Sequence, residues 1–267
     1  MMPQNGSHNC SMQMDTMSII KPQPKTKELI NQLVKSFIND VNIEELELKR
    51  IEREAERLPS YRDKNLVLGL ISMHSDDFLK AKNYFHNAIS SSASDNYTYN
   101  YLIICHEHFR KMTNIKNVIQ KGLKLYPNSV SLNRYLLDIS GKGLDVFSYE
   151  EAANSLCKMK KYTPVEDDKI FHVLLRFTQN IDDDEKQKIR LVGDEVLSLC
   201  EEFELRIAAQ SIYQLEDESI SCFYEVTQKK RNIDSFDLNW AFAGRMVKND
   251  LLKAPVVINF QLVKEDN

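Results

Sequence analysis

Three small residues and one aromatic residue recur at helical spacing in the stretch from Leu66 to Pro127. Gly69 lies in one apolar run, and Ala81 and Ala88 lie in the next run, on either side of Phe85. Small residues let the backbones of two antiparallel helices approach closely, and an aromatic ring fills the space beside them. This stretch therefore predicts closely packed helical hairpins.

The same residues resemble the tetratricopeptide repeat (TPR), a helix–turn–helix unit of about 34 residues. Gly69, Ala81 and Ala88 stand where that family places small residues. The segment 76–81, Asp-Asp-Phe-Leu-Lys-Ala, is similar to the turn that opens its second helix. The resemblance is strongest over 62–95. It implies TPR-like hairpin repeats over 26–165, with the last repeat needing a cover for its open end.

The chain beyond residue 165 has no family resemblance, but it has clear local signals. An amphipathic pattern from Val165 to Phe177 predicts one helix. Asp182 and Glu185 have the spacing of a helix cap and its third helical residue, and they open an apolar pattern that continues to Leu199. We therefore expect helices within 166–203.

The remainder, 205–267, is rich in β-branched and aromatic residues. The runs 207–215 and 220–226 are separated by polar residues and predict a hairpin, and 256–263 alternates as a strand does. The segment 238–247 fits either a third strand or a short helix, because its residues match both spacings. We expect a small antiparallel sheet of three or four strands.

The fold class predicted from these patterns is mainly α: TPR-like helical hairpin repeats followed by a small C-terminal α+β region with an antiparallel sheet. The predicted organisation is a disordered N-terminus over 1–25, helical repeats over 26–165, and the α+β region over 166–267. Translation could start at Met1 or at Met17.

Composition favours a cytoplasmic protein. The five cysteines are scattered, odd in number and never in a Cys-x-x-Cys pair, which is typical of reduced thiols rather than a disulfide framework. The sequence contains no apolar run long enough to span a bilayer, so we expect no membrane association. The acidic excess after residue 165 argues against nucleic-acid binding.

Few segments suggest chemistry. His106 and His108 are two residues apart, so one helix cannot direct both at one metal ion. Gly141-Lys142-Gly143 lacks the form of a phosphate loop. The basic run 229–231 fits a loop that leaves the hairpin. No Ser/His/Asp or Cys/His arrangement stands out, so we expect no catalytic residue, no metal and no cofactor, and the protein is more an interaction module than an enzyme.

The resemblance does imply a binding groove. In TPR proteins the first helices of successive repeats line a concave surface, and matching positions here predict seven groove residues on three of the expected helices. The carboxylate clamp that some members use for chaperone tails is not reproduced, because Gln32 and Ser36 occupy its first two positions. The predicted groove residues are Asp63, Met73, His74, Tyr97, Asn100, His108 and Arg134.

The predicted function is a scaffold or adaptor that binds a peptide or amphipathic helix of a protein partner in this groove. The alternative interpretation of Leu66, Leu70 and Ile104 is that they belong to the core between repeats. The alternative function is a TPR-regulated enzyme or toxin-like module, in which Tyr224, Glu225, Asp237 and Arg245 would converge near the strands. Self-association through the open repeat ends is also compatible with the pattern.

Overall fold

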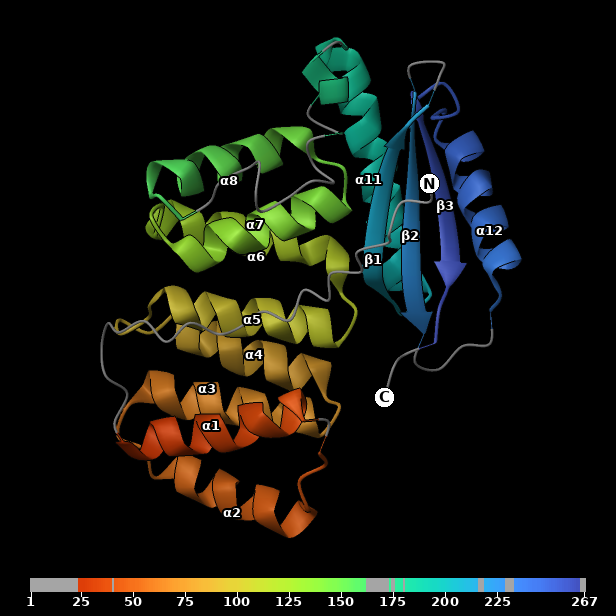
Figure 1. The fold of residues 1–267 in the computed structure, drawn as a ribbon. Helices are drawn as coiled ribbons and strands as arrows, with labels where there is room; N and C mark the ends of the chain where they lie inside the picture. Colours follow the sequence, from red (N-terminus) through yellow and green to blue (C-terminus); the bar gives the residue numbers. More distant parts are fainter. Residues whose placement is uncertain are drawn as a thin grey trace, which may run out of the picture. The chain divides into compact units, whose positions relative to one another are not determined.

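The computed structural model describes residues 24–39, 41–161, 173, 176–179, 181–215, 219–228 and 233–264. These residues form two compact units (Figure 1). The helical unit contains the described residues up to Phe109 together with 117–127, and the mixed unit contains 110–116 and the described residues from Asn128 onward. This division falls before residue 165. The N-terminus up to Pro22, most of the predicted helix between Val165 and Phe177, and the basic run 229–231 lie outside the described residues.

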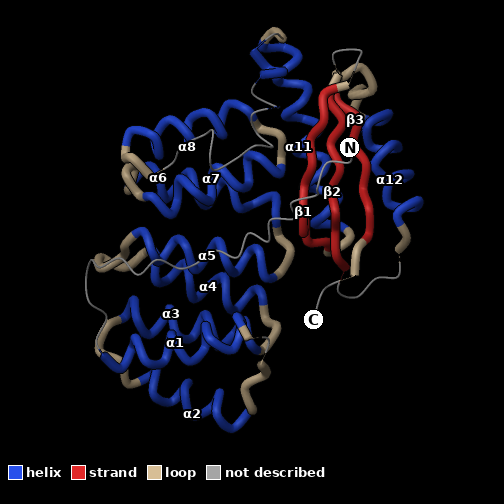
Figure 2. Tube along the Cα trace, viewed as in Figure 1, coloured by secondary structure: helices blue, strands red, loops and turns tan. Residues whose placement is uncertain are grey.

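The helical unit is built from antiparallel helices joined by short turns (Figure 2). One helix, α3, is its centre, because α1, α2, α4 and α5 all contact it. A short 3-10 helix, η1 (Met112–Asn114), leads into α6, which begins in the mixed unit and continues in the helical unit. The helices are α1 (Pro24–Ile38), α2 (Glu45–Glu56), α3 (Tyr61–His74), α4 (Phe78–Ile89), α5 (Asn96–His108) and α6 (Ile115–Leu125).

The pairing of α3 with α4 follows directly from the small residues in the sequence. A β-carbon at Gly69 would lie 2.6 Å from the Phe85 ring, which is closer than real β-carbon contacts. Ala81, Phe85 and Ala88 are fully buried. The helices begin at side-chain caps, since the Ser60 hydroxyl accepts from the Asp63 amide. The packing expected for these residues is confirmed.

The mixed unit combines one helical hairpin with a two-layer α/β arrangement. The hairpin is α7 (Val130–Lys142) with α8 (Val146–Lys158), and α11 (Asp183–Glu202) begins where the sequence predicted. Asp182 caps α11 by accepting from the Glu185 amide at 2.8 Å. The remaining elements are β1 (Leu205–Gln214), β2 (Ile220–Gln228), α12 (Ser235–Lys248) and β3 (Val256–Leu262).

The sheet has the order β1-β2-β3 and is mixed, so the expectation of an antiparallel sheet holds for only one of its two pairings. β1 and β2 form the predicted antiparallel hairpin, whereas β2 and β3 are parallel. The reason lies in the ambiguous segment 238–247, which is helical and belongs to α12. That helix returns the chain to the end at which β2 began, so β3 runs in the same direction as β2.

One face of the sheet forms the core of this unit. Ile220, Cys222, Tyr224 and Val226 of β2 are fully buried on that face. α11 contacts β1, α12 contacts β3, and the two helices contact each other, so both cover the same face (Figure 2). The chain as a whole is mainly helical with a small α+β region, as the sequence predicted.

Most helices that end in a tight turn do so without glycine. Asp76, Leu144, Lys160 and Asp250 follow α3, α7, α8 and α12, and each has a positive φ between 50° and 55°. The next residue donates its amide to a carbonyl five positions earlier, as Lys161 does to Leu156 at 2.9 Å. A left-handed conformation costs about 1 kcal/mol for a residue with a β-carbon.

We predict that Lys160→Gly raises the free energy of unfolding by about 1 kcal/mol, because glycine removes that cost at an exposed position. Glu151→Gly, an exposed change inside α8, should instead lower it by about 0.6 kcal/mol. Urea denaturation of both variants measures the difference. A loss of stability in Lys160→Gly would contradict the assignment of this turn.

A second prediction concerns the contact between α11 and the end of α7. A β-carbon at Gly193 would lie 1.6 Å from the Gly143 carbonyl oxygen. Gly193→Ala must therefore separate two backbones, and we expect it to lower the free energy of unfolding by about 3 kcal/mol or more. Gly141→Ala is the matched control, because its added carbon meets only the Tyr149 ring at 3.8 Å. Equal stability of the two variants would contradict this packing.

Candidate partner-binding surface

The C-terminal ends of α1, α3 and α5 meet in a cluster of aromatic and histidine rings. The Phe37 ring stacks on His74 with a centroid distance of 3.8 Å and meets the edge of His108 at 5.3 Å. His74 and His108 are the last residues of α3 and α5. Further ring contacts join His108 to Phe109 and Phe109 to Phe78. We call Phe37, His74, Phe78, His106, His108 and Phe109 the aromatic–histidine cluster.

His74 is fixed in this cluster by polar contacts to α1. Its Nε2 atom lies 3.1 Å from the Leu33 carbonyl oxygen and 3.0 Å from the Ser36 hydroxyl. A carbonyl oxygen can only accept, so Nε2 carries the proton of a neutral imidazole. Burial lowers the pKa of His74 below its ordinary value of 6.5, and the bond to Leu33 opposes that shift without cancelling it.

Two of the predicted groove residues therefore come together. His74 and His108 are joined through Phe37, which is not among the predicted groove residues. A signal was present in the sequence, because Phe37 continues the spacing of Leu29 and Leu33 along α1 and follows Ser36 directly. The sequence does not show how far α1 lies from α5, so it could not place Phe37 beside His108.

Tyr97 and Asn100 lie with His108 on one face of α5. These positions, with Ile104 between them, follow a spacing of three and four residues, which places them along one side of a helix. All four side chains are half-buried. The predicted α5 residues thus form one continuous strip, which we call the α5 face.

Asp63 and Met73 do not belong to an exposed groove, and here the prediction is corrected. α3 is surrounded by four helices, so Met73 is only 2% exposed, and Leu66 and Leu70 belong to the core. Asp63 is 3% exposed and accepts from the Arg62 guanidinium at 2.9 Å.

The Arg62 guanidinium also binds the Asp95 carboxylate at 2.9 Å. Asp95 caps α5 by accepting from the Thr98 amide. The buried Arg62–Asp63–Asp95 cluster therefore joins the starts of α3 and α5. Its role is structural, and removal of one partner would leave a buried charge uncompensated.

Arg134 is exposed on α7 and belongs to the mixed unit. It therefore belongs to a different unit from the predicted groove residues on α3 and α5.

The residues proposed for a catalytic site near the strands do not converge. Tyr224 is fully buried and donates to the Lys142 carbonyl oxygen, whereas its neighbour Glu225 is exposed on the opposite face of the sheet. Arg245 binds Glu195 and Ser198 of α11. Asp237 is exposed in the first turn of α12. Tyr224 and Arg245 therefore make separate structural contacts, and Glu225 and Asp237 are exposed elsewhere.

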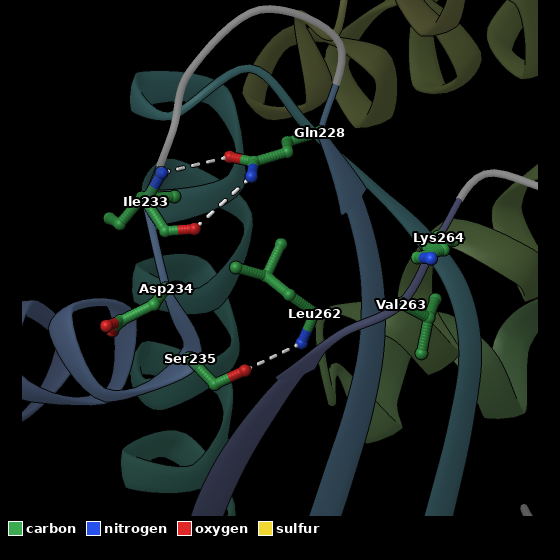
Figure 3. Close-up of a pocket in the computed structure, with 7 residues that line it drawn as sticks. All are labelled: Gln228, Ile233, Asp234, Ser235, Leu262, Val263 and Lys264. Carbon is green, nitrogen blue, oxygen red and sulfur yellow. Dashed lines mark hydrogen bonds between the residues drawn. The ribbon is translucent and has the colours of Figure 1, made fainter.

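A pocket of about 310 Å³ lies at the ends of β2 and β3 beside the start of α12 (Figure 3). Two of its polar side chains, Gln228 and Ser235, already have partners. The Gln228 side chain bonds to the backbone of Ile233 in both directions, and the Ser235 hydroxyl accepts from the Leu262 amide. The pocket offers no nucleophile with an adjacent base. Its lining is Gln228, Ile233, Asp234, Ser235, Leu262, Val263 and Lys264.

Comparisons with protein-family models, curated proteins and solved structures found no match for this chain. Among the described helices, none combines the length and the apolar character that a membrane span requires. Within the same described residues, no group of three or more His, Cys, Asp or Glu side chains is arranged to hold a metal ion.

We predict that the pKa of His74 in the folded protein lies below 6.5, because burial disfavours the charged imidazole. The unfolded chain then binds an additional proton as the pH falls through about 6.5, so stability is lost below that pH. NMR titration of the ring protons measures this directly. In urea denaturation, His74→Gln should lose less stability than the wild type between about pH 7.5 and 5.5.

His86 provides the control, because burial also lowers its pKa and it lies outside the cluster on α4. His86→Gln should leave the His74 titration unchanged. A His74 pKa at or above 6.5 would contradict the assignment of a buried, neutral imidazole.

Proposed function

We propose that the helical unit binds a peptide or an amphipathic helix of a protein partner along the α5 face, next to the aromatic–histidine cluster. The composition of α5 carries this proposal. Tyr97, Asn100, Ile104 and His108 make up this face without a lysine, arginine or carboxylate, whereas Tyr99 of the same helix is buried in the core. Interface cores are enriched in aromatic residues and depleted in charged residues.

The contrast with α2 supports the choice of α5. α2 has the sequence ELELKRIEREAE, and its outer surface is covered by ion pairs such as Lys49 with Glu45. Such a surface is well solvated, and displacing its water offers a partner little energy. The α5 face instead combines the half-buried ring of Tyr97 with the apolar side chain of Ile104, the amide of Asn100 and the imidazole of His108. Apolar anchors with a few polar groups suit an extended peptide or a helix.

The partner is not expected to present a free C-terminal carboxylate in the manner of a chaperone tail. Gln32 and Ser36 stand where a clamp of that kind would begin, and both are engaged within the unit. Gln32 donates to Glu47, and Ser36 contacts His74. Recognition would therefore rest on the internal side chains of the partner.

A cytoplasmic location forms part of the proposal. Burial raises the pKa of the thiols of Cys105, Cys200 and Cys222 to about 12, so these groups stay protonated and unreactive. Buried free thiols suit a reducing compartment.

The test uses the full-length chain and the variant Tyr97→Ala/Asn100→Ala/His108→Ala. Affinity capture from the native lysate identifies the partner, and calorimetry with the purified partner then gives the dissociation constant. We expect the triple variant to bind at least about tenfold more weakly, because the loss of a single hot-spot side chain costs about 2 kcal/mol or more.

The matched control is Lys80→Ala/Asn83→Ala/Asn87→Ala, which removes three exposed side chains from α4 of the same unit. Its affinity should stay within about twofold of the wild type. Equal affinities of the two triple variants would reject the α5 face as the binding surface.

A further inference from the structure

A stripe of apolar residues runs along the solvent-facing side of α12. Phe236 and Trp240 are each 73% exposed, and Val247 is 63% exposed. With the exposed Ala243 they follow helical spacing, so all four share one face of the helix. We call these four residues the α12 stripe. Isolated exposed apolar residues are common on proteins, but an aligned row that includes two aromatic rings marks an interaction surface.

The opposite face of the same helix accounts for the packing of α12 within the protein. Leu238, Phe242 and Met246 are buried, and the Phe242 ring meets Phe260 of β3 at a centroid distance of 5.4 Å. The Phe236 and Trp240 rings stack on each other at 6.4 Å. The α12 stripe is therefore not needed to hold the helix on the sheet.

Gly244 is a second, independent feature of this face. A β-carbon added there would meet nothing within 4 Å. Glycine in an exposed helix interior is less stable than alanine by about 1 kcal/mol. Among the residues that the structure describes, no contact requires that cost, in contrast to Gly193, where the Gly143 backbone fills the space. A close approach of another backbone from outside would explain it.

We propose that α12 pairs in antiparallel orientation with α12 of a second copy of this chain. The two aromatic residues Phe236 and Trp240 lie in the first half of the stripe, whereas the second half has only Ala243 and Val247, with Gly244 beside them on one flank. Only antiparallel pairing places the bulky half of each helix against the small half of the other. Parallel pairing would oppose Trp240 to Trp240 and leave a gap beside the small residues.

The charges beside the stripe are also self-complementary. Asp237 lies near the start of α12 and Lys248 at its end, and helical spacing places both exposed side chains on the same flank of the stripe. In an antiparallel pair with two-fold symmetry, Asp237 of each copy lies beside Lys248 of the other. The helix dipoles are antiparallel as well, which favours the same arrangement.

The stripe is short, so the interface is small and the expected dimer is weak, with a dissociation constant in the micromolar range. Sedimentation equilibrium of the full-length chain from about 1 to 200 µM should show a reversible monomer–dimer equilibrium. Trp240→Ala should weaken the dimer at least about tenfold, because a central tryptophan is a typical hot spot. Leu79→Ala, which removes a side chain 70% exposed on α4, should leave it unchanged.

Two charge variants test the orientation. In a dimer of either variant, Asp237→Lys or Lys248→Asp, residues 237 and 248 of facing copies carry like charges at both symmetry-related contacts. Each variant alone should therefore dimerise about tenfold more weakly. An equimolar mixture of the two should recover dimerisation, because both contacts in the mixed dimer are again attractive. Failure of the mixture to recover would overturn the antiparallel pairing.

Gly244→Ala distinguishes an effect on dimerisation from an effect on the stability of the monomer. The added methyl group should weaken the dimer, yet in the monomeric Trp240→Ala background it should raise the melting temperature. A wild-type chain that stays monomeric up to about 200 µM would overturn the proposal. A monomer that instead co-sediments with anionic phospholipid vesicles through Trp240 would overturn it in favour of a membrane-surface contact.

Discussion

The packing of the helical unit depends on glycine at position 69, because glycine has no β-carbon. The Phe85 ring occupies the space where a β-carbon would stand, so α3 and α4 approach closely enough for Ala81 and Ala88 to be fully buried between them. α3 thereby becomes the central helix, and α1, α2 and α5 pack on its remaining sides. A helix enclosed in this way cannot contribute much to a binding surface. That role falls to the α5 face, where half-buried aromatic and polar groups remain.

In the mixed unit, too, a glycine allows two backbone segments to approach closely. The Gly193 backbone lies against the Gly143 carbonyl, so α11 meets the end of α7 without an intervening side chain. From this contact α11 extends along β1, and Arg245 of α12 binds Glu195 of α11. Gly244 differs from Gly193, because a β-carbon added at Gly244 would meet nothing within 4 Å. Gly193 is required by a backbone contact within the chain, whereas Gly244 is explained by the contact that we propose between two chains.

Local signals predicted the elements better than their arrangement. The Asp182 cap, the β1–β2 hairpin and the Gly69–Phe85 packing were all correct, because each depends on residues that are close in the chain or on a repeated spacing. The parallel pairing of β3 was missed, since Leu238, Trp240 and Phe242 alternate as a strand would. Their burial resolves the ambiguity, because Trp240 faces solvent while Leu238 and Phe242 face the sheet.

Asp63 and Met73 were misplaced because their burial depends on how many helices surround α3, which no local pattern encodes. Phe37 was missed for the same reason.

The central claim, that the α5 face receives a protein partner, is tested most directly by site-specific photo-crosslinking in the native cell. A photoreactive phenylalanine analogue replaces Tyr97 on α5 in one variant and Lys80 on the exposed face of α4 in another. The account predicts one dominant adduct from position 97, mapped to a single peptide of one protein, and no such adduct from position 80. Equal labelling from both positions, or an adduct from position 80 alone, would contradict it.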